Sequence, residues 1–164
     1  MGICIKQLEE MLEDLHLYHF VNGTDEDLYI PFQLKNENIL IHVMLLENGR
    51  LIRFVVSPFK HLMYVKNKTK VLVKCMERNT HIKLLKYCYD SDTDNICLDI
   101  AIPLEDNTLT EAQLKRCLHY MTNVITNERS HFNYLLENGA WPETDEMLDI
   151  SRSVADLFRN SNME

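Results

Sequence analysis

The chain of 164 residues is long enough for one domain with a single hydrophobic core. It carries 17 Lys and Arg against 25 Asp and Glu, a formal net charge of −8 at pH 7. Nucleic-acid binding needs a concentrated basic patch, and the one basic run, at 66–74, reads as the solvated face of a helix. No apolar run approaches the roughly 20 residues of a membrane span. The composition therefore excludes nucleic-acid and membrane partners.

The amino-terminal residues lack the charged, apolar and small-residue regions of a signal peptide. Five cysteines are scattered along the chain without a CxxC spacing: Cys4, Cys75, Cys88, Cys97 and Cys117. An odd number without paired spacing predicts neither a disulfide framework nor a zinc site. Because apolar residues surround each of them, we expect buried, reduced thiols and a cytoplasmic protein.

The first half of the chain predicts one helix and a three-stranded meander. Apolar residues recur at steps of three and four over residues 3–17, as in an amphipathic helix. Strand-like runs follow at 28–34, 38–46 and 50–57. The loops between them are so short that only antiparallel hairpins are possible. Pro58 is expected to end the third strand.

The second of these strands is apolar on both faces. One face carries Ile39, Ile41, Val43 and Leu45, and the other carries Leu40, Met44 and Leu46. A sheet that helices cover on one side only would leave the second set exposed to water. We therefore expect the far face to be covered too, by the last helix of the chain or by a second subunit.

A second helix is predicted at about 67–79, and strands at 83–89 and 95–103 follow it. The inner face of this helix is expected to carry Val71, Leu72, Cys75 and Met76. The second strand alternates apolar and other residues with a period of two. The few residues between the strands are acidic and predict a hairpin turn.

A capping box at Thr110 and Gln113 begins a long helix, which Gly139 ends as a left-handed cap. Glu128 and Arg129 are expected to interrupt its apolar stripe for one turn.

A last amphipathic helix is expected at about 144–160. The order of elements is then α-β-β-β-α-β-β-α-α. Strands in runs, joined by tight turns and flanked by helices, predict an α+β fold with an antiparallel five-stranded sheet. We expect a single domain over residues 1–164, with its core at 3–139 and the last helix as an addition.

The acidic turn contains Asp90, Asp92 and Asp94, the spacing that opens an EF-hand calcium loop. Such a loop needs Gly at its sixth position and a bidentate Glu at its twelfth. The chain has Asn95 and Ala101 there, and strands flank the turn where an EF-hand has helices. A solvated turn, in which Asp side chains bond their own backbone, explains the cluster better.

Four residue pairs could supply a nucleophile with its base, or two metal ligands: Cys117 with His119, Cys75 with His81, Cys88 with His42, and His16 with His19. Cys117 and His119 point to different faces of one helix. The next two pairs could meet only through tertiary contacts, and two histidines alone do not make a metal site. The sequence therefore predicts no catalytic, cofactor-binding or metal-binding residues.

Residues 84–118 carry a recognisable pattern. A strand ends in Tyr89-Asp90, an acidic turn and the alternating strand 96–102 follow, and then come Leu104-Glu105-Asp106 and a helix start at 109–114. This pattern resembles the YbjN family of bacterial sensory transduction regulators, which shares the fold of type III secretion chaperones. The resemblance in element order extends over about residues 3–139.

The resemblance implies a function without catalysis. Secretion chaperones are small, acidic, cytoplasmic homodimers that bind extended segments of partner proteins. We therefore predict a non-enzymatic protein-binding module, a homodimeric regulatory or chaperone-like adaptor with an unidentified protein partner. A dedicated type III secretion chaperone for an effector protein is the alternative. A small-ligand receptor or an enzyme is the third hypothesis.

Overall fold

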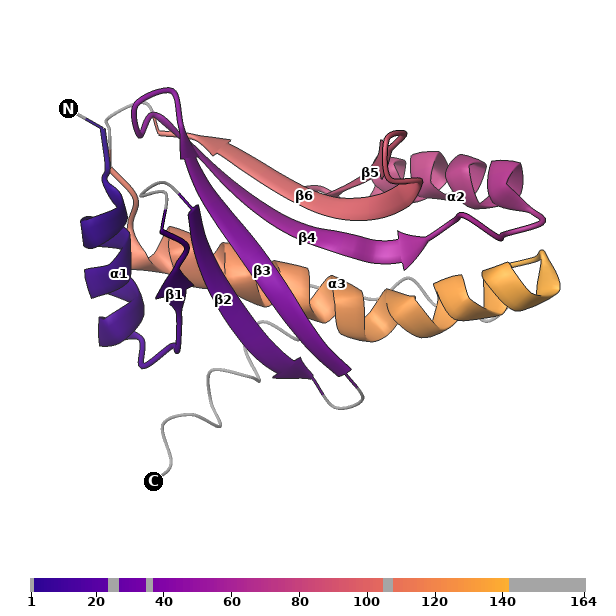
Figure 1. Ribbon diagram of the computed structural model, residues 1–164, viewed down its shortest axis with the longest axis horizontal. Coiled ribbons are helices and arrows are strands. Elements are labelled where there is room, and N and C mark those ends of the chain that lie inside the picture. Colours follow the sequence, from indigo (N-terminus) through magenta and orange to yellow (C-terminus); the bar gives the residue numbers. More distant parts are fainter. Residues whose placement is uncertain (1, 24–26, 35–36, 105–107, 142–164) are drawn as a thin grey trace.

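The computed structural model describes residues 2–23, 27–34, 37–104 and 108–141. It shows helices on one side of an antiparallel sheet with the strand order β1-β2-β3-β4-β6-β5 (Figure 1). The elements are α1 (Ile5–Asp14), β1 (Phe20–Val21), β2 (Asp27–Leu34), β3 (Glu37–Leu46), β4 (Leu51–His61), α2 (Lys68–His81), β5 (Lys86–Asp90), β6 (Asn95–Pro103) and α3 (Glu111–Asn138). The predicted helix at 144–160 lies outside the described residues.

The α+β class and the antiparallel meander are confirmed, but the predicted number of strands is one too few. The additional strand, β1, has two residues and pairs with the outer edge of β2, where Phe20 faces Tyr29. A strand this short shows no alternation of apolar and polar residues, so the sequence pattern could not reveal it.

The prediction that Pro58 ends the third strand is wrong. β4 continues to His61, and its pairing with β6 shifts register between Val56 and Lys60. Proline has no N–H to donate to the sheet, and an irregularity in the pairing accommodates it without ending the strand. The continued strand brings Phe59 into the core and Lys60 towards α3.

The long helix begins and ends as predicted. The Thr110 hydroxyl accepts a hydrogen bond from the Gln113 N–H at 3.1 Å, and the Gln113 side chain accepts one from the Thr110 N–H at 2.8 Å. Gly139 follows the last turn with a φ of 68°, a left-handed conformation that glycine adopts without steric cost.

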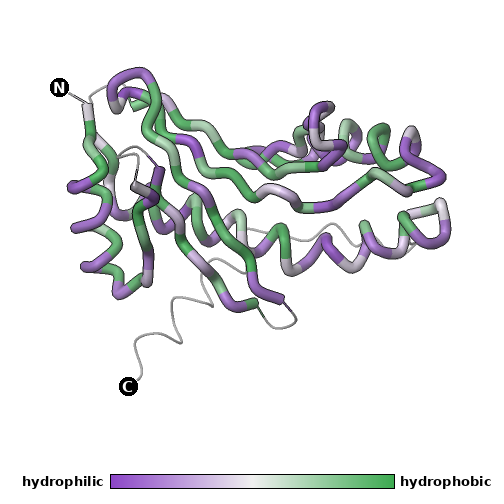
Figure 2. Tube along the Cα trace, viewed as in Figure 1, coloured by the Kyte–Doolittle hydropathy of each residue, from purple (hydrophilic) through white to green (hydrophobic). Residues whose placement is uncertain are grey.

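The core lies between one face of the sheet and the helices α1 and α3. Its buried members include Leu28 and Ile30 of β2, Ile41 and Val43 of β3, Ile52 and Phe54 of β4, Leu98 and Ile100 of β6, Leu8 and Leu12 of α1, and Leu114, Met121, Ile125 and Phe132 of α3. Figure 2 shows the apolar residues of α1 on the side that faces the sheet. α2 packs at the other end, beside β5 and α3.

The apolar residues of β3 divide between the two faces. Ile39, Ile41 and Val43 are buried in the core, whereas Leu40 is 42% exposed and Leu46 is 37% exposed. No element within the described ranges covers this outer face. The prediction that the last helix of the chain or a second subunit covers it stays a prediction, and that helix lies outside the described residues.

The predicted inner face of α2 needs a correction. Val71 and Cys75 are buried and Leu72 is partly buried, but Met76 is 71% exposed. The main packing partners of α2 are β5 and α3. A helix at the end of the sheet buries a narrower stripe than a helix across its centre, which leaves Met76 in water.

Candidate functional site

The acidic turn between β5 and β6 is a hairpin turn, as predicted. The Asp92 N–H donates to Asp90 Oδ1 at 3.0 Å, and the Thr93 hydroxyl donates to Asp90 Oδ2 at 2.6 Å. Asp94 pairs with Lys68 and accepts a hydrogen bond from the Tyr89 hydroxyl at 2.7 Å. The Thr93 hydroxyl lowers the pKa of Asp90, and Lys68 lowers that of Asp94.

The Asp90 carboxylate therefore serves the turn itself, and the Asp94 carboxylate joins the turn to α2 and β5. In the part of the chain that the structure describes, no group of three or more His, Cys, Asp or Glu side chains could hold a metal ion. The described residues also contain no helix with the length and apolarity needed to cross a membrane.

The cysteines divide into two groups. Cys75, Cys97 and Cys117 are buried as expected, but Cys4 and Cys88 are exposed, so the expectation of five buried thiols is wrong. Cys4 precedes the first turn of α1, and Cys88 lies on the outer face of the edge strand β5. Burial raises the pKa of Cys75 to about 12 and that of Cys117 to about 11, which removes the thiolate a nucleophile requires.

The structure does not bring together the candidate pair Cys88 and His42. Cys88 on β5 and His42 on β3 have the strands β6 and β4 between them. His119 lies beside Asn123, one turn along the same helix, with 2.8 Å between its Nε2 and the amide nitrogen. Burial lowers the pKa of His119, so its ring is neutral at pH 7.

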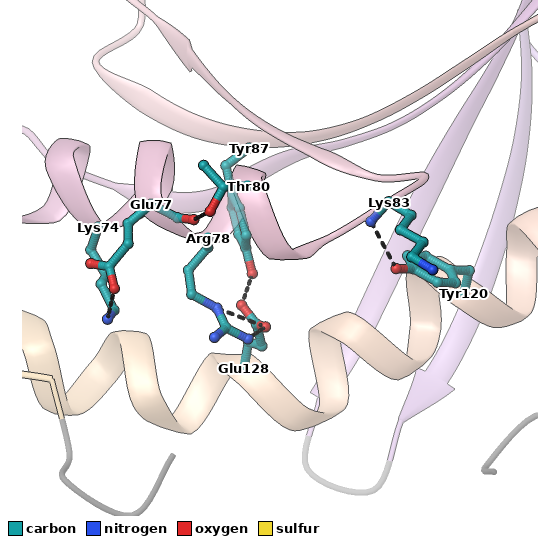
Figure 3. Close-up of polar contacts among 8 residues, drawn as sticks. All are labelled: Lys74, Glu77, Arg78, Thr80, Lys83, Tyr87, Tyr120 and Glu128. Carbon is teal, nitrogen blue, oxygen red and sulfur yellow. Dashed lines mark hydrogen bonds and ion pairs between the residues drawn. The ribbon is translucent and has the colours of Figure 1, made fainter. Parts of the chain in front are cut away.

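The polar residues in the middle of α3 are not a solvent-exposed interruption. Glu128 is only 2% exposed and pairs with Arg78 of α2. It also accepts a hydrogen bond from the hydroxyl of Tyr87 on β5 (Figure 3). Burial, followed by the nearby charge of Glu128, raises the pKa of Tyr87 far above its ordinary value. The three side chains join α2, β5 and α3 inside the core.

The next residue of α3 makes an ion pair on another side of the helix. Arg129 Nε lies 2.6 Å from Glu37 Oε1, at the start of β3. The sequence indicated polar residues at 128 and 129 but gave no sign of their partners, which are about 50 and 90 residues away in the chain.

An apolar pocket of about 210 Å³ lies where the end of α1, β2 and α3 meet. Its walls are formed by Leu15, Leu17, Phe32, Lys115, Leu118, His119 and Thr122. The Thr122 hydroxyl donates to the Leu118 carbonyl at 3.0 Å, and Lys115 pairs with Glu111. With these polar groups already engaged, the pocket suits an aliphatic side chain.

The outer face of the sheet is the second surface of interest. Tyr29 stacks between Phe20 and His42, with ring centroids 5.4 and 4.6 Å apart. In the centre of this face, Arg53 Nε donates to Asp99 Oδ2 at 2.8 Å. The face thus combines exposed aliphatic residues of β3, an aromatic stack at one edge and a charged pair.

No protein-family model matches the chain, and no curated protein matches its sequence. Solved structures match it in fold. YbjN, a candidate transcription regulator from E. coli, aligns with a TM-score of 0.53 and 16% identity, over 79% of this chain and 93% of that chain. A chain of the HopA1–SchA chaperone–effector complex aligns with a TM-score of 0.55 and 11% identity, over 76% and 91%.

A chain of the ExsC–ExsE complex aligns with a TM-score of 0.56 and 13% identity, over 79% of this chain and 96% of that chain. The fold predicted from residues 84–118, shared by YbjN and type III secretion chaperones, is therefore confirmed. At these identities the likeness establishes the fold.

Proposed function

We propose that this chain is a non-enzymatic, cytoplasmic protein-binding module, a homodimeric adaptor with a regulatory or chaperone-like role. The observation that carries the proposal is the outer face of the sheet, where the strand β3 exposes Leu40 and Leu46. Apolar side chains gathered on a regular element, without a cover from the described residues, are typical of a protein–protein interface.

The chemistry of the described residues supports binding rather than catalysis. The buried thiols of Cys75 and Cys117 have raised pKa values, and Asp90 of the acidic turn uses its carboxylate for hydrogen bonds within the turn. The fold adds support, because one similar solved structure is a chaperone–effector complex.

In the proposed arrangement, the outer face of β3 and β4 packs against a second copy of the chain. An interface of about 800 Å² per subunit would be sufficient for a stable dimer. The apolar pocket between α1, β2 and α3 then remains available for a side chain of the partner protein.

Sedimentation velocity tests the dimer. We expect the unaltered protein to sediment as a dimer, and a variant with Leu40→Glu and Leu46→Glu to sediment as a monomer with unchanged circular dichroism. Met76→Glu is the matched control, because Met76 is also exposed and lies on α2, away from this face. A monomeric unaltered protein from which affinity capture in the native host recovers no partner would contradict the proposal.

A dedicated secretion chaperone is the second candidate, and the likeness to the HopA1–SchA complex favours it. The deciding experiment is co-purification of the protein with the amino-terminal segment of a secreted effector from the same host. If the proteins that bind it stably are never secreted, the result would favour the regulatory adaptor.

A further inference from the structure

A second, larger pocket of about 460 Å³ lies further along α3. It is lined by Leu34, Glu37, Lys60, Thr126, Arg129, Ser130 and Asn133. The α3 residues that line the two pockets are 115, 118, 119 and 122, followed by 126, 129, 130 and 133. Apart from the adjacent pairs 118/119 and 129/130, these residues follow at steps of three and four, which places all of them on one face of the helix. On β2, Phe32 lines the first pocket and Leu34 the second.

The second pocket is cationic, although the whole chain has a net charge of −8. Lys60 and Arg129 contribute two positive charges, and Glu37 contributes one negative charge. The guanidinium of Arg129 lies over the ring of Phe59, 5.0 Å from its centroid, which fixes its position. The Lys60 ammonium donates to the side-chain oxygen of Asn133.

The single carboxylate of Glu37 does not balance the positive charges of both Lys60 and Arg129. Arg129 Nε lies close to Glu37, but its N–H is not directed at the carboxylate and finds no hydrogen-bond acceptor among the described residues. Burial, and then repulsion from Arg129, lowers the pKa of Lys60. A second negative group in this pocket would relieve that repulsion. The exposed hydroxyl of Ser130 adds a hydrogen-bond donor at the pocket wall, whereas the Thr126 hydroxyl donates to the Thr122 carbonyl at 2.9 Å.

The distance between the pockets sets the length of a ligand that could fill both. Leu118 and Arg129 are 11 residues apart on α3. At a rise of about 1.5 Å per residue, this separation is about 16 Å. An extended peptide covers that distance with about five residues.

We propose that the two pockets together bind one extended segment of a partner protein, with an aliphatic side chain in the apolar pocket and an Asp or Glu about five residues away in the cationic pocket. This inference rests on the proposed function, since it assumes that the chain binds proteins. The inference specifies which side chains the bound segment carries and how far apart they are.

Selection of random linear peptides displayed on phage, with the full-length protein as target, tests the proposal. We expect the selected peptides to contain Leu, Ile, Val or Met about five residues from an Asp or Glu. A selected peptide is then synthesised with a fluorescent label, together with a version in which its acidic residue is replaced by the corresponding amide. Fluorescence anisotropy measures the binding of both.

Lys60→Gln should weaken binding of the acidic peptide by about tenfold or more and leave the amide peptide unaffected, because hydrogen bonds to charged groups are the strong ones. Glu37→Gln removes the competing carboxylate and should tighten binding of the acidic peptide. Lys66→Gln, a substitution of the same kind at an exposed loop position, is the matched control and should change the binding of neither peptide.

The outcomes separate this inference from the proposed function. Peptides that are selected without an acidic residue, or that bind the Lys60→Gln variant equally well, would overturn the inference and leave a protein-binding module in place. A failure to select any peptide, together with a monomeric protein that captures no partner, would overturn both.

Discussion

The buried pair between Arg78 of α2 and Glu128 of α3 permits a quantitative test of how the helices are held together. The Arg78 side chain is 11% exposed, and Glu128 is almost completely buried. Arg78→Met keeps most of the apolar stem but removes the charge, which leaves the Glu128 carboxylate in the core without its ion-pair partner. Breaking a buried pair in this way costs about 3–5 kcal/mol.

Replacing both partners has a different consequence. In the double variant with Arg78→Met and Glu128→Leu, no charge of the pair remains buried, and methionine and leucine can pack against each other. Such replacements are often close to neutral. The Tyr87 hydroxyl loses its acceptor in this variant, which costs about 1–3 kcal/mol. We therefore expect the double variant to be more stable than either single variant.

Urea unfolding at pH 7, followed by circular dichroism, gives the free energy of unfolding of all four proteins. Arg116→Met, at an exposed position on α3, is the control and should change stability by no more than about 0.5 kcal/mol. If the effects of the two single substitutions add to that of the double variant within about 0.5 kcal/mol, the two residues are not coupled. That result would refute the role assigned to the pair.

Three further predictions concern local features. Thr110→Ala removes the amino-terminal cap of α3 and should lower the free energy of unfolding by about 1 kcal/mol. Thr110→Ser should keep most of this stability, and urea titration measures both variants. Gly139→Ala places a side chain at a φ of 68°, where its Cβ would lie 2.7 Å from an amide nitrogen of Asn67, and should cost about 1–2 kcal/mol in the same assay. Labelling of the native protein with a thiol reagent at pH 8, followed by mass spectrometry, should modify Cys4 and Cys88 and reach the three buried thiols only after unfolding. Cys88 should react more slowly than an unperturbed thiol, because partial desolvation of its sulfur raises its pKa and reduces its thiolate fraction. Labelling of a buried cysteine at the same rate as Cys88 would contradict the assigned burial.

The features that the sequence predicted correctly depend on neighbouring residues. Thr110 and Gln113 are three residues apart, Gly139 directly follows the helix that it ends, and the strand 95–103 alternates with a period of two. Local signals of this kind fix the helix ends and the hairpins, and hence the fold class. The errors arise where contacts with residues distant in the chain determine the local structure. Pro58 remains within a strand because β6 pairs with β4 on both sides of the register shift.

The binding surface could be predicted only in part for the same reason. Periodicity placed Leu118 and Arg129 on one long helix, but the opposite walls of the pockets come from the end of α1 and from β2, β3 and β4. A polar residue in the apolar stripe of a helix indicates that another side chain of the protein pairs with it. It does not identify that side chain. Lys60 follows the proline that was expected to end the third strand, so nothing in the sequence placed it opposite α3.

The two polar residues at the centre of α3 show how much the order of neighbouring residues matters. Successive residues of an α-helix point about 100° apart, so Glu128 reaches α2 while Arg129 reaches the start of β3. Exchanging the two residues would leave composition and net charge unchanged. It would nevertheless place an arginine against Arg78 and a glutamate against Glu37, two like-charge contacts in partly buried positions. The cationic pocket would then lose the guanidinium of Arg129. The order of Glu128 and Arg129 in the helix therefore determines both the buried ion pair of the core and the charge of the proposed binding surface.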